Sequence, residues 1–111
     1  MHWIFAHLIG DYFLQNDWMA LNKKTKSVPA LVHVIFYCIP FLFCNLEWWQ
    51  FSLIGLQHFI QDRTNFVVWF MKFKGSEKFA SGPCAPWSII LTDNILHILF
   101  IAFIVWVKKL I

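Results

Sequence analysis

Four apolar runs divide the chain, and each is close to the length that a helix needs to cross a lipid bilayer. They cover about residues 3–20, 29–44, 48–71 and 87–107 of the 111-residue sequence. A membrane-spanning helix needs ~20 mostly apolar residues, because each residue advances the helix by ~1.5 Å. The connections between the runs are short. The sequence therefore predicts an all-α fold, an integral membrane four-helix bundle with short loops.

The composition favours the same environment. Hydrophobic residues make up 59% of the chain and charged residues only 14%, whereas a soluble domain carries roughly a quarter charged residues. The seven tryptophans lie near the ends of the apolar runs, where aromatic side chains meet the lipid headgroups. We therefore expect residues 1–111 to form a single transmembrane domain with membrane lipid as a partner.

The lysines indicate an orientation. Most of them fall in the first and third connections, and they are Lys23, Lys24, Lys26, Lys72, Lys74 and Lys78. The positive-inside rule places these connections in the cytoplasm, which predicts a multi-pass protein of the cell inner (cytoplasmic) membrane with both termini outside. Because the lysines cluster at helix ends, their expected partners are anionic headgroups and not nucleic acid.

Three of the apolar runs carry a histidine and an aspartate four residues apart. The pairs are His7–Asp11, His58–Asp62 and Asp93–His97. Four residues are slightly more than one helical turn, so both members of a pair project from one helix face. Ionisable side chains in apolar helices are costly and usually face a partner, a cavity or an ion. In the expected topology every aspartate lies nearer the cytoplasm than its histidine, which favours one shared, buried polar site.

The residue types in this site favour a metal. With His33 from the second run, the candidate ligands are His7, Asp11, His33, His58, Asp62, Asp93 and His97. Imidazole and carboxylate together suit a divalent ion, with zinc as the first choice and manganese or iron as alternatives. These ligands exceed the needs of one tetrahedral ion. The site would hold one or two ions, or its aspartates Asp11, Asp62 and Asp93 would include catalytic groups.

Further polar residues on the same helix faces are candidates for orienting the ligands by hydrogen bonds. They are Gln15, Tyr37, Gln61, Asn65 and Asn94. Arg63 is the only arginine and follows Asp62 directly. It is a candidate for binding a lipid or substrate phosphate, with a structural ion pair as the alternative.

These residues leave three kinds of function open. A metal-activated water would make the protein a metal-dependent hydrolase of a phosphate-containing or lipid-linked substrate. The same side chains would also serve a small transporter or channel for a divalent cation or a proton. In a third alternative, a membrane interaction protein would use its buried polar groups only to fix helix packing. Four thin spans enclose little volume, which is consistent with a homodimer.

The run His-Leu-Ile-Gly-Asp-Tyr-Phe-Leu-Gln-Asn-Asp-Trp-Met-Ala, from His7 to Ala20, resembles the opening of an uncharacterised family of small membrane proteins of bacteria and their phages. That family is expected to carry a later His-x-x-x-Asp, which His58–Asp62 matches. The resemblance implies a membrane bundle. A weaker similarity is to membrane-bound metal-dependent hydrolases, although their Asp-rich loop and His-Arg-x-x-x-His segment are absent here.

Overall fold

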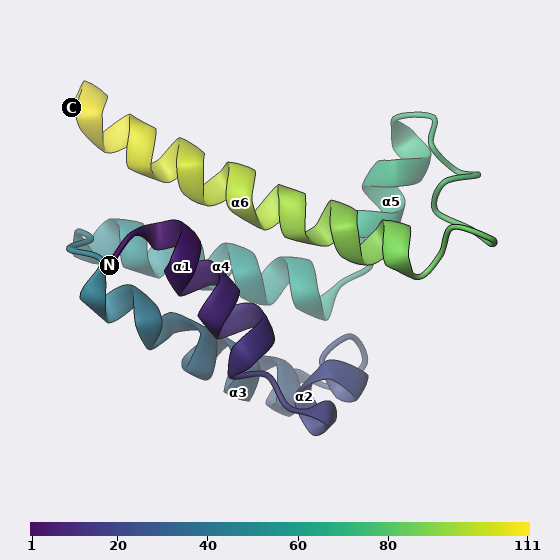
Figure 1. Ribbon diagram of the computed structural model, residues 1–111, viewed down its shortest axis with the longest axis horizontal. Helices are drawn as coiled ribbons and strands as arrows, with labels where there is room; N and C mark the ends of the chain where they lie inside the picture. Colours follow the sequence, from purple (N-terminus) through teal and green to yellow (C-terminus); the bar gives the residue numbers. More distant parts are fainter.

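Helix α4 (Trp48–Arg63) lies at the centre of the protein and packs against helices on two sides. The computed structural model describes residues 1–111 and contains helices but no strand, which confirms the all-α prediction. Helix α3 (Ser27–Cys38) and helix α6 (Trp87–Leu110) run alongside α4, as Figure 1 shows. The remaining α-helices are short, namely α1 (Trp3–Leu8), α2 (Asp17–Asn22) and α5 (Phe66–Phe73).

Two helices change their winding. A π-helical segment, η1 (Ile9–Phe13), continues α1 directly, and a 3-10 segment, η2 (Pro40–Phe43), follows α3. Pro40 has no N–H group to donate to the preceding turn, which explains why regular α-helix ends just before it. Segment η1 crosses α3 closely, because Gly10 has no side chain at the point where it meets Tyr37.

The helices do not provide the four full-length membrane spans that the sequence predicted. By length and composition α6 alone, with 24 residues, is long and apolar enough to cross a membrane. One such helix is weak evidence for a membrane location, since the core helix of a soluble protein passes the same test. The multi-pass prediction is therefore not supported by helix length.

The first and third apolar runs are each broken into separate helices, and side-chain hydrogen bonds mark the breaks. Asn16 adopts an extended backbone conformation, and its side-chain oxygen accepts a hydrogen bond from the N–H of Met19, so that α2 starts afresh there. Helix α4 ends at Arg63, short of the expected residue 71, with Thr64 also extended. The Lys24 ammonium donates to the carbonyls of Gln61 and Thr64, which satisfies the end of α4.

Both chain termini lie at one end of the bundle, and the α2–α3 and α5–α6 connections lie at the other (Figure 1). Hydrogen bonds agree with this view. The N-terminal ammonium donates to the Phe43 carbonyl, and Lys108 forms an ion pair with Glu47 near the start of α4. An apolar core fills the interior on the terminal side of the polar residues, and its members are Ala6, Tyr37, Phe41, Ile54, Ile101 and Ile104.

Candidate metal centre

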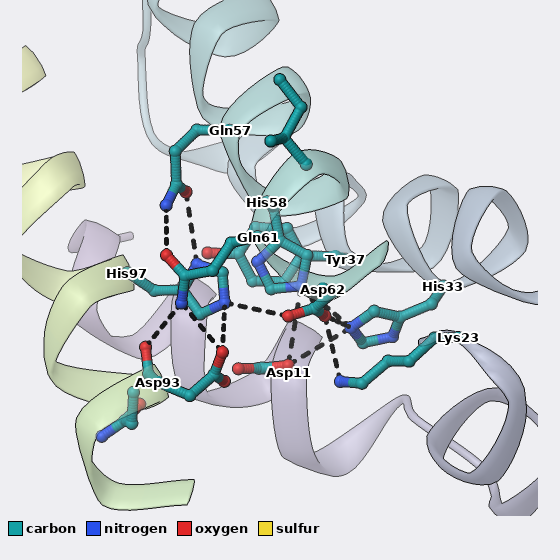
Figure 2. Close-up of polar contacts among 12 residues, drawn as sticks. Asp11, Lys23, His33, Tyr37, Gln57, His58, Gln61, Asp62, Asp93 and His97 are labelled. Carbon is teal, nitrogen blue, oxygen red and sulfur yellow. Dashed lines mark hydrogen bonds and ion pairs between the residues drawn. The ribbon is translucent and has the colours of Figure 1, made fainter. Parts of the chain in front are cut away.

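Four potential ligand atoms converge in the interior from η1, α3 and α4 (Figure 2). They are Asp11 Oδ1, His33 Nε2, His58 Nε2 and Asp62 Oδ2, and we call them the inner site. The two imidazole Nε2 atoms lie 2.9 Å apart. Asp62 Oδ2 lies 3.1 Å from His33 Nε2 and 3.0 Å from His58 Nε2. Asp11 Oδ1 lies 3.2 Å and 3.6 Å from the same two nitrogens.

These separations match the edges of a metal coordination polyhedron. Metal–ligand bonds of ~2.0–2.1 Å place the donor atoms of a tetrahedral ion about 3.3–3.4 Å apart. The measured contacts between the four residues bracket that value, and all four side chains are buried. The inner site could therefore hold a divalent ion, which is the metal prediction in its general form.

Ring stacking holds the imidazole of His58 in place. The ring lies 3.6 Å from that of Tyr37 on one side and 4.1 Å from that of His97 on the other, both nearly parallel to it. The Nδ1 atoms of His33 and His58 are buried without a hydrogen-bond partner. Metal-binding histidines usually hydrogen-bond through their second nitrogen, so packing takes over that orienting role here.

A second group of potential ligands adjoins the first and consists of Asp11, Asp93 and His97, which we call the outer site. His97 Nε2 lies 3.5 Å from Asp93 Oδ1 and 3.2 Å from Asp62 Oδ1. Asp93 is half-buried, whereas Asp11 and His97 are buried. The aspartates and three of the four predicted histidine ligands thus form one continuous cluster.

The fourth of these histidines, His7, lies outside both ligand groups. Its Nε2 donates to Asn94 Oδ1 at 2.6 Å, and its Nδ1 accepts from the Tyr37 hydroxyl at 2.8 Å. Both ring nitrogens are therefore in use. The predicted pairing with Asp11 does not form, because Asp11 contacts His33 and His58 while both ring nitrogens of His7 have other partners.

Tyr37→Phe is expected to destabilise the protein without releasing metal. The substitution removes the hydroxyl that donates to His7 and leaves a buried nitrogen unpaired, which costs about 1–3 kcal/mol. Unfolding in detergent should report the loss of stability, and elemental analysis should report unchanged metal content. A fall in metal content with unchanged stability would show that Tyr37 belongs to the ligand set.

Glutamines connect the outer site to the surface. The Gln61 amide donates to both the carbonyl and the carboxylate of Asp93, at 3.0 and 2.8 Å. Gln57, one turn earlier on α4, donates to Gln61 Oε1 at 2.6 Å and contacts His97 Nδ1 at 3.2 Å. Gln61 was a predicted orienting residue, but Gln57 was missed, although its four-residue spacing from Gln61 is a signal that could have identified it.

Lys23 was predicted to contact lipid headgroups, but the structure places it beside the potential ligands. Its ammonium lies 3.0 Å from Asp62 Oδ2 inside the site and does not extend toward headgroups. Arg63 instead donates to the Lys24 carbonyl and the Ser27 hydroxyl, and so fastens the end of α4 to the start of α3. The structure therefore gives the cation beside the ligands to Lys23 and not to Arg63.

A cavity of about 380 Å³ leads from the surface to the ligands. Its polar lining includes the carboxylates of the cluster, the side chains of Gln15 and Asn65, and two lysines, Lys23 and Lys24. Its apolar lining comes from three helices and includes Ala20 on α2, Val67 and Val68 on α5, and Ile89 and Ile90 on α6. The cavity thus combines apolar side chains, ammonium groups and potential metal ligands.

The charges of the cluster favour an added cation. Asp11, Asp62 and Asp93 contribute three carboxylates, and Lys23 is the one lysine or arginine paired with any of them. With neutral imidazoles the cluster carries excess negative charge on largely buried side chains, which is costly. A divalent ion would remove that excess.

A protein-family model described as "Protein of unknown function (DUF3307)" matches residues 1–110. No curated protein and no solved structure gives a significant match to the chain. The match agrees with the resemblance to an uncharacterised family, while the opening motif and the similarity to membrane-bound hydrolases stay predictions.

Proposed function

Because the chain belongs to this family of unknown function, we propose an activity from its own site: metal-dependent hydrolysis of a phosphate ester on a lipid-like molecule, within the membrane. The observation that carries the proposal is the lining of the cavity, which contains lysines, potential metal ligands and apolar side chains. Such a lining suits a substrate with a phosphate at one end and a hydrocarbon portion at the other.

The membrane location rests on exposed apolar side chains. Large hydrophobic residues are exposed along the three long helices, including Leu31 and Ile35 on α3, Leu53 and Leu56 on α4, and Ile95, Leu99 and Phe103 on α6. Soluble monomers rarely expose apolar patches that large. We place α6 across the inner membrane and the other helices within it. The lysine-bearing connections at one end of the bundle support a cytoplasmic location for that end.

A divalent ion in the inner site would supply a Lewis acid for water and for a phosphoryl oxygen. The ammonium groups of Lys23 and Lys24 would hold the phosphate oxygens. Water adds to phosphorus while the bond from phosphorus to the leaving oxygen breaks. Asp93 lines the cavity outside the inner site, and one oxygen of its carboxylate takes the proton from the water and returns it to the leaving oxygen, so that the products are an alcohol and inorganic phosphate.

The alternative of cation transport is less well supported, because the side of the site facing the chain termini is closed. The apolar core there includes Phe41, Ile54 and Ile101, all nearly inaccessible to solvent. An ion in transit would need polar groups or water along that route.

A purely structural role explains the excess of carboxylates poorly, since helix packing needs no uncompensated charge.

Phosphate release tests the proposal directly. Purified protein in detergent would be loaded with Zn²⁺ or Mn²⁺ and given phosphatidic acid in mixed micelles, with p-nitrophenyl phosphate as a substrate that lacks a lipid tail. Release of inorganic phosphate from the lipid that a chelator abolishes is the expected result. Metal-loaded protein that releases no phosphate from the lipid would overturn the proposed activity.

Lys23→Ala is expected to raise KM for the phosphate lipid about 10- to 100-fold, because a charge-assisted hydrogen bond contributes roughly 1.5–3 kcal/mol. Lys26→Ala is the matched control, since Lys26 is exposed and does not line the cavity. Metal content must be measured in both variants, because Lys23 also contacts Asp62. Equal KM values in the two variants would exclude Lys23 from phosphate binding.

A further inference from the structure

We propose that the outer site binds a second divalent ion, and that Asp11 and Asp62 bridge the two ions. The inference rests on the inner site of the proposed function and extends it to a two-metal centre. Three observations carry it. They are the positions of the two carboxylate oxygens of Asp62, the oxygen of Asp11 that has no hydrogen-bond partner, and the direction of the hydrogen bonds that reach His97.

Asp62 presents one oxygen to each site. Its Oδ2 atom contacts the nitrogens of His33 and His58 in the inner site, at 3.1 and 3.0 Å. Its Oδ1 atom lies 3.2 Å from His97 Nε2 in the outer site. A carboxylate placed in this way can bind two ions at once, one through each oxygen, and the ions of two-metal sites lie about 3.5–4 Å apart.

Asp11 repeats this arrangement with one oxygen unpartnered. Its Oδ1 atom faces the inner histidines, whereas its Oδ2 atom is buried and has no hydrogen-bond partner. The side chain is almost inaccessible to solvent. Figure 2 shows the free oxygen on the side of Asp93, and Asp11 supplies a ligand atom within 4.8 Å of those of Asp93 and His97. An unpaired buried carboxylate oxygen is costly, and a cation in the outer site would satisfy it.

Hydrogen bonds determine which ring nitrogen of His97 carries a lone pair toward the outer site. The backbone carbonyl of Asp93 can only accept, so the Gln61 amide must turn its NH₂ group toward it. Gln61 Oε1 then accepts from the NH₂ group of Gln57, which leaves Gln57 Oε1 facing His97 Nδ1. In the neutral ring, Nδ1 therefore carries the hydrogen and Nε2 carries a lone pair.

That lone pair points at carboxylate oxygens of Asp62 and Asp93, 3.2 and 3.5 Å away. Electron-rich atoms facing one another at these distances repel unless a positive charge lies among them. A divalent ion there satisfies His97, Asp93 and the free oxygen of Asp11 together. With two ions and Lys23 the centre becomes positively charged overall, which suits a phosphate substrate and places the second ion where it can contact the leaving oxygen.

Metal stoichiometry distinguishes this inference from the proposed function. The protein would be loaded with Mn²⁺, dialysed and analysed for manganese, and its electron paramagnetic resonance spectrum recorded. We expect two ions per wild-type chain and a spin-coupled signal. Asp93→Asn and His97→Gln should keep one ion and give the signal of isolated Mn²⁺. The matched controls are Asp17→Asn and His2→Ala, which change exposed residues outside the cluster and should keep both ions.

Other results have separate meanings. One ion in the wild type, unchanged in Asp93→Asn, would overturn the second site and leave the inner site intact. No bound ion in any protein would overturn both proposals. Gln57→Leu provides an independent variant, because Gln57 orients His97 from a half-buried position and is not a ligand. It should weaken binding of the second ion alone, by about 10- to 100-fold, and a variant that binds the second ion as tightly as the wild type does would contradict the inference.

Discussion

Asp62→Asn is expected to lower metal affinity by at least about 100-fold and to abolish phosphate release. The Asp62 carboxylate contacts His33, His58 and His97 within 3.2 Å and also pairs with Lys23. Asparagine has nearly the same shape, but it is neutral and turns an NH₂ group toward one set of these partners. A loss of about 2.8 kcal/mol in binding corresponds to a 100-fold change. Competition with a chromogenic chelator measures the affinity.

Asp17→Asn is the matched control for this substitution. Asp17 is exposed in the first turn of α2 and contacts none of the potential ligands. It should retain the metal affinity and activity of the wild type, with a stability change of no more than about 1 kcal/mol from the helix terminus. Wild-type metal affinity in Asp62→Asn would refute the inner site.

Gly10→Ala is expected to destabilise the protein by about 3 kcal/mol and to disturb metal binding. A Cβ atom at residue 10 would lie 2.7 Å from the Tyr37 carbonyl oxygen and 3.0 Å from its Cα atom. These are backbone atoms that cannot move aside locally, and overpacking of this kind costs about 1–3 kcal/mol or more. Helix propensity alone predicts the opposite sign, a gain of roughly 0.5–1 kcal/mol. The neighbouring Asp11 would shift with the backbone.

Gly55→Ala provides the graded comparison. A Cβ atom there would meet the sulfur of Cys38 at 3.1 Å, and that side chain can adjust. Its effect should be smaller than that of Gly10→Ala, about 1 kcal/mol or less. Unfolding of both variants in the same detergent gives the difference. If Gly10→Ala proved as stable as the wild type, the close contact between η1 and α3 would be incorrect.

The sequence predicted which side chains lie close together in two of the three histidine–aspartate pairs. His58–Asp62 on α4 and Asp93–His97 on α6 have the predicted spacing, and their side chains lie 3.0 and 3.5 Å apart. His33 also joined them as predicted. The pairing within His7–Asp11 did not form, because His7 hydrogen-bonds to Asn94 and Tyr37 while Asp11 contacts His33 and His58. Periodicity places two side chains on one helix face, but it carries no signal for the partners that other helices bring to them.

Tertiary contacts were harder to predict. Lys23 lies in a connection, where no periodic pattern reveals what it faces, and only the folded chain brings it to Asp62. The lengths of the first and third helices were also overestimated. Their ends depend on the cap at Asn16 and on Lys24 at the end of α4, and the second of these comes from a distant segment. The sequence stays apolar beyond the ends of both helices, so its composition does not show where they stop.

The potential metal ligands come from four separate stretches of the chain, η1, α3, α4 and α6. No partly folded chain brings them together, so an ion would bind the complete fold and not its opened forms. Excess metal at 100 times Kd would then add about 2.7 kcal/mol to stability. Because cellular proteases act on opened chains, metal supply would govern how long each molecule survives as well as whether it works.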